Sequence, residues 1–403
     1  TKLGYTFKDN PTLVAYLLTL VAATMPVAVT SALVYRMGRL FELRRPWRMV
    51  LALSVVTGSG LIAYATVINS HAPAAALVVS AVACLVHVAG SKNPARNGGW
   101  IALAGLCAAL AAAIEPAALV FVVLLAVCVP CMRWRPSLRV GALLLYLIGC
   151  TPPIVMHAAL NVPITGDLRP GVMHPDLWTP HHPSYARGTR VVERVGATGD
   201  GAELPAALSE LDDLYEDGVS DSVWLLVGRA VNRVLVALFG PHGILSHFPV
   251  LILGLLGIAA VMHRHWPVTT KALATATFVG ALAVVFLFAW FWTDWQEPMF
   301  GARWFVLFLP LLLFWSGAWL RKSHHPVSWG LAIAALAFSS AVALIGATYP
   351  FPREGFPGYT AAGALKQLIV KPQAPDVREA LARTPVRERG GLEGFGGDPR
   401  HGR

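Results

Sequence analysis

The residues 290–305, WFWTDWQEPMFGARWF, place one arginine, Arg303, after a run of aromatic residues and two acids. Aromatic side chains gathered in this way are typical of the boundary between a membrane and water. A guanidinium group binds carboxylates and phosphates through paired, charge-assisted hydrogen bonds. Arg303 therefore has two kinds of candidate partner: a nearby acid, Asp294 or Glu297, or the phosphate of a lipid or pyrophosphate.

Two short connections between apolar runs carry further polar side chains. Glu115 precedes a proline between two short apolar runs, so it is either a solvated turn residue or an acid that faces a cavity. Asn69 and His71 lie in the sequence NSHAP, which is either a simple helix–helix turn or part of the lining of that cavity. Both connections are candidate substrate-binding elements.

A third candidate is the glycine-rich and proline-rich stretch FGPHGILSHFP, residues 239–249, which contains His242 and His247. Irregular backbone at membrane depth is tolerated where it is buried in protein or lines a cavity. We expect His242 to line the same cavity as the residues above. Two histidines without a carboxylate at ligand spacing are weak evidence for a metal site.

Sequence motifs of soluble enzymes do not occur in the chain. There is no phosphate-binding P-loop, no dinucleotide fingerprint, no zinc-protease helix and no serine-nucleophile elbow. We predict no cofactor and no metal ligands, apart from one acidic stretch that is either a solvated helix face or a site for a divalent cation: Asp212, Asp213, Glu216 and Asp217.

The elements that position these residues must lie in lipid. Hydrophobic residues make up 56% of the 403 residues and charged residues only 13%, against roughly 25% charged residues in soluble domains. A chain of this composition cannot cover a globular surface with polar groups, so its apolar surface must face a bilayer. The net charge of +10 does not indicate nucleic-acid binding, because the basic residues sit in short clusters between apolar runs.

A membrane-spanning helix needs about 17–25 mostly apolar residues. The sequence predicts an all-α, polytopic transmembrane bundle of about ten helices, at roughly 11–35, 49–68, 73–90, 99–114, 116–132, 139–158, 246–262, 268–291, 302–320 and 326–346. The fourth and fifth of these are short. They are either two short helices joined by a tight turn, or one of them is re-entrant.

Lysine and arginine gather in alternate connections between these runs, and the other short connections contain none. Basic connections stay on the cytoplasmic side of a membrane. The pattern predicts a multi-pass protein of the cell (inner) membrane, with fourteen basic residues in the cytoplasm: Arg36, Arg39, Arg44, Arg45, Arg48, Lys92, Arg96, Arg133, Arg135, Arg139, Arg264, Lys271, Arg321 and Lys322.

The same pattern divides the chain into four parts. Residues 1–158 and 246–346 contain the predicted transmembrane helices, and residues 159–245 form a large extracytoplasmic loop with amphipathic or interfacial helices. Residues 223–239 are expected to form an interfacial helix rather than a span, because they contain two arginines. Residues 347–403 are predicted to be an extracytoplasmic, disordered tail.

Four runs in the chain, INSHAPAAALVVSAVACLVH, GLCAALAAAIEPAALVFVVLL, GPHGILSHFPVLILGLLG and FGARWFVLFLPLLLF, resemble bacterial members of the GT-C superfamily of membrane glycosyltransferases. The nearest relatives in this resemblance are the protein-mannosyltransferase and aminoarabinose-transferase enzymes, over roughly residues 10–346. The resemblance implies transfer of a sugar from a polyprenyl-phosphate donor to an acceptor at the outer face. Such enzymes place an essential acid in the first outer loop. The chain begins at Thr1 rather than methionine, so we expect that acid upstream of it and assign no catalytic base.

In this interpretation Arg303 neutralises the donor phosphate, while the other candidates orient the sugar or the acceptor: His242, Asn69, His71 and Glu115. The expected partners are the lipid bilayer, the polyprenyl-phosphate sugar and an unidentified acceptor, with no nucleic acid. Two other classes remain open. A transporter or flippase of lipid-linked substrates predicts ionisable groups near mid-membrane and inverted repeats. A non-catalytic membrane protein would be favoured if the upstream segment lacks an acidic residue.

Overall fold

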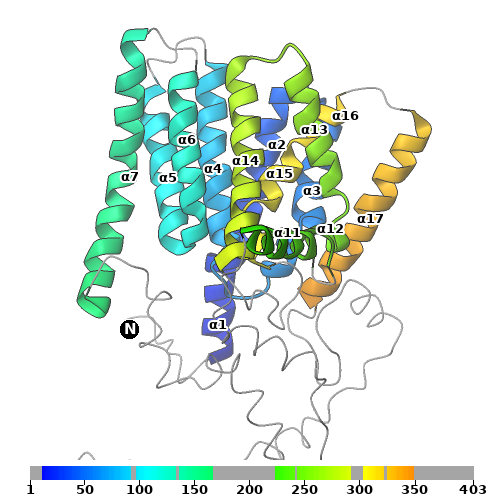
Figure 1. Cartoon of the computed structure of the whole chain (residues 1–403), viewed down its shortest axis with the longest axis horizontal. Helices are drawn as coiled ribbons and strands as arrows, with labels where there is room; N and C mark the ends of the chain where they lie inside the picture. Colours follow the sequence, from blue (N-terminus) through cyan, green and yellow to red (C-terminus); the bar gives the residue numbers. More distant parts are fainter. Residues whose placement is uncertain are drawn as a thin grey trace, which may run out of the picture. The chain divides into compact units, whose positions relative to one another are not determined.

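Helices form all the regular secondary structure in the part of the chain that the computed structural model describes, and no strand occurs there. The described residues are 11–91, 97–132, 136–166, 223–240, 243–291, 303–321 and 325–348. All of them belong to the first of two compact units, residues 1–365. The all-α prediction is therefore confirmed for this part of the molecule, in which most helices lie side by side (Figure 1).

Five helical stretches are long and apolar enough to cross a membrane. The first, Thr12–Phe41, combines α1 (Pro11–Thr19), a π-helical turn (Leu20–Thr24), α2 (Met25–Met37) and a 3₁₀ turn (Gly38–Phe41). The other four are single helices: α4 (His71–Gly90), α7 (Pro136–Thr165), α14 (Val268–Phe291) and α17 (Pro326–Thr348). These apolar helices indicate a multi-pass membrane protein.

The other five predicted spans are shorter or interrupted in the structure. They correspond to α3 (Arg45–Gly58), α5 (Gly98–Ile114), α6 (Leu119–Cys128), α13 (Leu251–His263), and the pair α15 (Leu309–Phe314) and α16 (Ser316–Leu320). Counting the bent pair that ends in α13 gives a sixth possible span. Part of the difference from ten has a local cause, since Gly60 follows the end of α3 and Pro116 separates α5 from α6, both in connections that contain candidate residues.

One such break follows α3, where Gly60 has a φ of +73° and begins a 3₁₀ turn, Leu61–Tyr64. A side chain at this position would overlap the ring of Phe248, which is buried. The connection is fixed on both sides. The Thr24 hydroxyl donates to the Ala65 carbonyl oxygen at 2.7 Å, and the Thr66 hydroxyl donates to the Ala347 carbonyl oxygen at 3.1 Å.

Close packing against α7 fixes α5, the helix that ends at the candidate acid Glu115. A Cβ atom added to Gly149 of α7 would overlap the backbone of Ala102 in α5. Small residues at such contacts let two helices approach closely, which is typical of helix packing in membranes. The Tyr146 hydroxyl also donates to the Val122 carbonyl oxygen of α6 at 3.0 Å, so α7 holds both short helices.

After the sixth predicted span, α11 (Val223–Phe239) and α12 (Ile244–His247) precede α13. Residues 230–247 make an angle of 96° with α13, and α11 crosses the direction of the neighbouring helices in Figure 1. The Arg233 side chain donates to the Ala289 carbonyl oxygen near the end of α14, at 3.3 Å. The predicted helix is present, and its location at the membrane interface stays a prediction.

The two ends of the bundle differ in charge. The end that contains the start of α3 and the end of α13 we call the basic end; its described arginines include Arg36, Arg39, Arg44, Arg45, Arg48, Arg264 and Arg321. Helix α3 runs from there to the connection that precedes α4, at the opposite end. We call that opposite end the cluster end.

Candidate functional site

A buried carboxylate–imidazole pair joins two of the predicted site residues at the cluster end. His71 is the first residue of α4, and Glu115 follows α5 where Pro116 prevents the helix from continuing. The distance between His71 Nδ1 and Glu115 Oε2 is 2.9 Å, and the two side chains are only 9% and 8% exposed. The Ser70 hydroxyl donates to the same carboxylate oxygen at 3.0 Å. Two helix ends thus bring a base and an acid together.

Aromatic rings enclose this pair. The ring of Tyr64 meets the His71 ring edge-on, with 6.2 Å between the ring centres. Trp304 meets the same imidazole at 5.4 Å, and Phe288 of α14 lies 5.4 Å from Trp304. The rings come from three segments far apart in the sequence, and they keep most water away from the pair.

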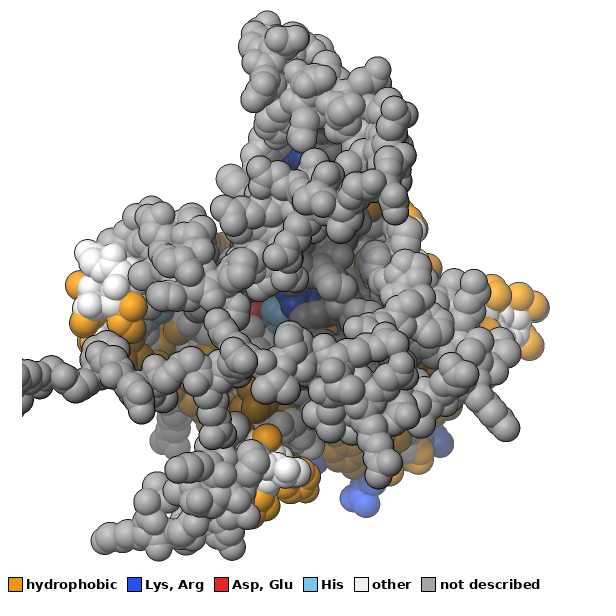
Figure 2. All heavy atoms as spheres, turned by 90° about the horizontal axis from the view of Figure 1, so that it is seen from below, with side chains coloured by type: hydrophobic (Ala, Val, Ile, Leu, Met, Phe, Trp, Pro, Cys, Tyr) orange, Lys and Arg blue, Asp and Glu red, His pale blue; other side chains and the backbone are white. Residues whose placement is uncertain are grey.

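Arg303 is the third predicted site residue in this region. It begins a 3₁₀ turn, Arg303–Phe305, and its Cζ atom lies 4.4 Å from the centre of the Trp304 ring. Burial raises the pKa of the Tyr64 phenol, and the positive charge of Arg303 acts in the opposite direction. Figure 2, seen from this end, shows acidic, histidine and basic side chains next to one another near the centre of the face.

Asn69 lies beside these residues but has a different role. Its side-chain amide donates to the carbonyl oxygens of Tyr64 at 2.7 Å and Val67 at 2.6 Å, and its Oδ1 accepts from the Ala72 amide at 2.8 Å. These bonds close the turn before α4 and satisfy one amide of the helix's first turn. Of the two sequence interpretations, the geometry favours the turn residue, which positions His71.

The stretch at 239–249 is only partly described, and His242 lies outside the described residues. His247 is fully buried in α12, with Nδ1 2.9 Å from the Gly243 carbonyl oxygen. The Ser246 hydroxyl donates to the carbonyl oxygens of Gly240 at 2.7 Å and Gly243 at 2.9 Å. His247 therefore contributes to the local turn structure, and the described residues contain no group of three potential metal ligands.

Several predicted features cannot be compared with the structure, since they fall on residues outside the described ranges. These are most of the outer loop, the acidic stretch that was a candidate cation site, the alternative partners of Arg303, and the tail: residues 167–222 with Asp212, Asp213, Glu216 and Asp217, then Asp294 and Glu297, then residues 349–403.

The arrangement has two chemical capabilities. The Glu115 carboxylate lies 2.9 Å from His71 Nδ1, and an ionised carboxylate in this place would favour a proton on Nδ1 and leave Nε2 as the basic nitrogen. Arg303 supplies a positive charge and planar hydrogen-bond donors close by, which suit a phosphate or carboxylate. The site therefore combines a proton acceptor with an anion-binding group.

Sequence reasoning did not identify Ser70, Tyr64 or Trp304. Ser70 adjoins His71, and Trp304 adjoins Arg303, so proximity to a predicted residue was the available signal. Tyr64 carried no such signal, because it was assigned to the interior of a span that the structure interrupts at Gly60. Comparisons of this chain with protein-family models, with curated proteins and with solved structures found no match.

Proposed function

We propose that the cluster end is the active site of a membrane glycosyltransferase that takes a sugar from a polyprenyl-phosphate donor. One observation carries the proposal: a buried His71–Glu115 pair lies beside Arg303 at the end of the bundle opposite the basic connections. Ionisable groups are costly at membrane depth and are retained there mainly for function. A site at the end of a bundle of apolar helices can receive a lipid-linked substrate directly from the bilayer.

Arg303 is the group that would bind the donor phosphate. A phosphate accepts two parallel hydrogen bonds from a guanidinium group, and the stacking of Arg303 against Trp304 holds the planar group in one orientation. The positive charge would stabilise the polyprenyl phosphate as it leaves the sugar, because negative charge develops on the phosphate oxygen in that step.

His71 would accept the proton from the attacking hydroxyl group of the acceptor. The acceptor oxygen forms a bond to the anomeric carbon of the sugar while the bond from that carbon to the phosphate oxygen breaks. The electron pair of the broken bond leaves with the polyprenyl phosphate, and the acceptor proton moves to His71 Nε2. Glu115 and Ser70 act as positioning residues, since they hold the imidazole in the required orientation.

Binding and transfer can be measured separately. A photoreactive polyprenyl phosphate tests binding, and a radiolabelled polyprenyl-phosphate sugar added to native membranes, which supply the acceptor, tests transfer. Arg303→Gln should lower crosslinking about tenfold, because losing one charged hydrogen bond weakens binding by about that factor. His71→Gln should leave crosslinking unchanged and slow transfer about a hundredfold or more.

The matched control is Arg139→Gln, which removes an exposed arginine of α7 from the opposite end of the bundle. It should alter neither measurement. Equal crosslinking of wild type and Arg303→Gln would contradict the assignment of the phosphate-binding group. Transfer at the wild-type rate in His71→Gln would contradict the assignment of the proton acceptor.

A second candidate is transport of a lipid-linked substrate, favoured by helix breaks next to the site at Gly60 and Pro116. Discontinuous helices with polar groups at the break are typical of transporter binding sites. This candidate predicts that the purified protein moves a fluorescent polyprenyl phosphate between leaflets of a vesicle without cleaving any sugar. Sugar transfer with no movement between leaflets would exclude it.

A further inference from the structure

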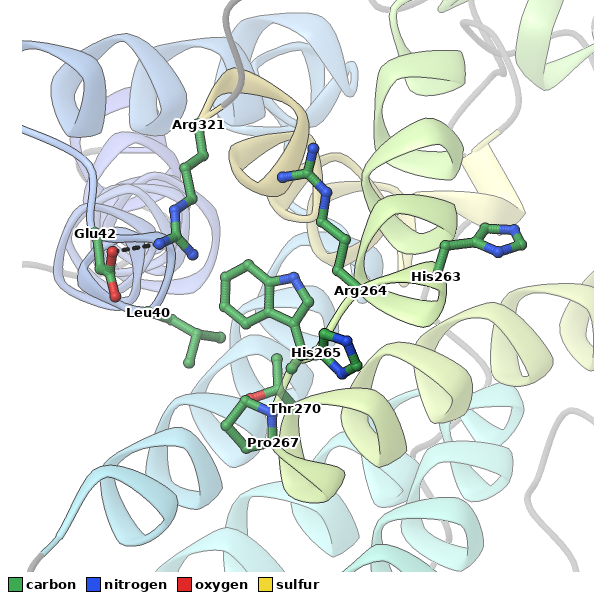
Figure 3. Close-up of a pocket in the computed structure, with 9 residues that line it drawn as sticks. Leu40, Glu42, His263, Arg264, His265, Pro267, Thr270 and Arg321 are labelled. Carbon is green, nitrogen blue, oxygen red and sulfur yellow. Dashed lines mark hydrogen bonds and ion pairs between the residues drawn. The ribbon is translucent and has the colours of Figure 1, made fainter.

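A pocket with a volume of 830 Å³ lies at the basic end, away from the proposed active site. It is formed by the turn after α2, the α13–α14 connection and the end of α16, and Figure 3 shows its lining: Leu40, Glu42, His263, Arg264, His265, Trp266, Pro267, Thr270 and Arg321. Two arginines and a single carboxylate line the pocket, so it carries an excess of positive charge.

The two arginines differ in their partners. Arg321 forms an ion pair with Glu42 and lies over the ring of Trp266, with its Cζ atom 5.3 Å from the ring centre. Arg264 reaches toward the same side of the pocket, while His263 points away from it (Figure 3). The described part of the chain contains two acids, Glu42 and Glu115, and neither pairs with Arg264. Among the residues that the structure describes, the Arg264 guanidinium group therefore has no carboxylate partner.

The floor of the pocket adds further groups that favour an anion. Pro267 directly precedes α14 and Thr270 lies in its first turn; this helix of 24 residues carries partial positive charge at its first turn. The hydroxyl of Thr270, a buried residue, can donate a hydrogen bond. Together with Arg264, which has no carboxylate partner among the described residues, these groups suit a phosphate better than a carboxylate, since a phosphate offers more acceptor oxygens.

Exposed apolar residues adjoin two of the pocket-lining residues in the sequence. Val268, next to Pro267, is 67% exposed, and Met262, next to His263, is 43% exposed. In a membrane protein such residues face acyl chains. A ligand that fits both surroundings carries a phosphate and a hydrocarbon part, and basic pockets between helices at the cytoplasmic side of a membrane are known to bind anionic headgroups.

We propose that this pocket binds the phosphate of an anionic membrane lipid between Arg264 and Arg321. The proposal does not depend on the proposed function, because it concerns the opposite end of the bundle and other residues. In the structure Arg321 forms an ion pair with Glu42. The lipid phosphate must therefore compete with this carboxylate for one of its two arginines.

The competition between the lipid phosphate and Glu42 for Arg321 provides the test of this proposal. Native mass spectrometry of the detergent-solubilised protein, titrated with phosphatidylglycerol, measures lipid binding directly. Arg264→Gln should weaken binding about tenfold. Glu42→Gln should strengthen it severalfold, because Arg321 is released from its carboxylate. A substitution that merely damaged the fold could not produce this gain.

Three controls define the ligand. Arg139→Gln removes an exposed arginine that does not line the pocket, and it should bind phosphatidylglycerol like wild type. Phosphatidylcholine, whose phosphate is balanced by a choline, should bind far more weakly. Inorganic phosphate at the same concentration should not displace the lipid, since it lacks the acyl chains that the adjoining apolar residues would contact.

Equal affinity of Arg264→Gln and Arg139→Gln would overturn the proposal, because binding would then reflect the general charge of this end. Unchanged or weaker binding by Glu42→Gln would also overturn it. Displacement of the lipid by equimolar inorganic phosphate would overturn the choice of a lipid and identify a soluble phosphate as the ligand. If Arg303→Gln left the crosslinking of polyprenyl phosphate unchanged, the proposed active site would be contradicted and the proposed lipid-binding pocket would not be affected.

Discussion

Each end of the bundle has one pair of an acidic and a basic side chain in the described part of the chain, and the two pairs differ in their surroundings. At the cluster end His71 and Glu115 are 9% and 8% exposed. At the basic end Arg321 and Glu42 are 41% and 71% exposed. The first pair has lost most of its hydration and depends on its partners, whereas water screens the second and lets it exchange partners.

This difference in exposure suits two different functions, proton transfer and anion binding. A fixed, dehydrated pair keeps an imidazole in one orientation, which proton transfer requires. The exposed pair of Arg321 and Glu42 lies in the same pocket as Arg264, and Arg321 can leave Glu42 for an incoming anion at little cost in free energy. We infer that burial distinguishes a proposed catalytic site from a proposed lipid-binding site, although both are built from basic and acidic side chains.

The largest expected effect concerns the opposite exposure of the two ends. Arg44→Cys and Ile68→Cys place thiols at exposed positions of the basic end and of the connection before α4. Both variants carry Cys131→Ser, which removes the exposed native cysteine. A membrane-impermeant maleimide should label position 68 from outside intact cells and position 44 only in inverted vesicles, because basic connections face the cytoplasm.

Cells permeabilised with detergent provide the control, since both positions should then react. Labelling of positions 44 and 68 from the same compartment would show that the two ends do not face opposite sides. The proposed function and the lipid site would then both lose the orientation on which they rely.

The next largest effect should come from breaking the buried pair. Glu115→Ala removes the carboxylate that lies 2.9 Å from His71 Nδ1 and that accepts a hydrogen bond from the Ser70 hydroxyl, in a dehydrated site. We expect a loss of about 3–5 kcal/mol in the free energy of unfolding. Unfolding by SDS in mixed micelles, followed by circular dichroism, measures this change, and Glu115→Gln should lose less because its amide oxygen still accepts from Ser70.

Gly60 fixes the backbone of a connection at the cluster end, so its substitution tests how much that end depends on backbone conformation. Gly60→Ala combines an unfavourable positive φ with overlap against Phe248, and we expect a loss of about 2 kcal/mol in the same measurement. Gly141→Ala is the matched control, because a Cβ there meets no atom within 4 Å and alanine favours a helix. Equal stability of the two variants would contradict the strain at Gly60.

The sequence predicted the distribution of basic residues well enough to separate the two ends, since charge follows directly from residue type. It also predicted that Asn69, His71, Glu115 and Arg303 lie near helix breaks. It did not predict the role of Asn69, because a hydrogen-bonded turn residue and a ligand-binding residue look alike in a short connection.

The contacts between distant segments were beyond sequence reasoning. Trp304 reaches His71 across more than two hundred residues, and only packing of the intervening helices decides that distance. The interruption at Gly60 was likewise hidden inside an apolar run, because one glycine does not lower the hydropathy of a predicted span. The pocket at the basic end is formed by three connections that are far apart in the sequence, so no sequence pattern indicates that they meet.

The smallest effect should come from the exposed pair. Glu42→Ala should lower the free energy of unfolding by less than about 1 kcal/mol in neutral detergent, because exposed ion pairs gain little over hydrated side chains. The difference from wild type should shrink further in high salt, which screens exposed charges. The Glu115→Ala loss should persist there, since salt does not reach a buried pair. If both variants lost the same stability and responded equally to salt, burial would not distinguish the two ends.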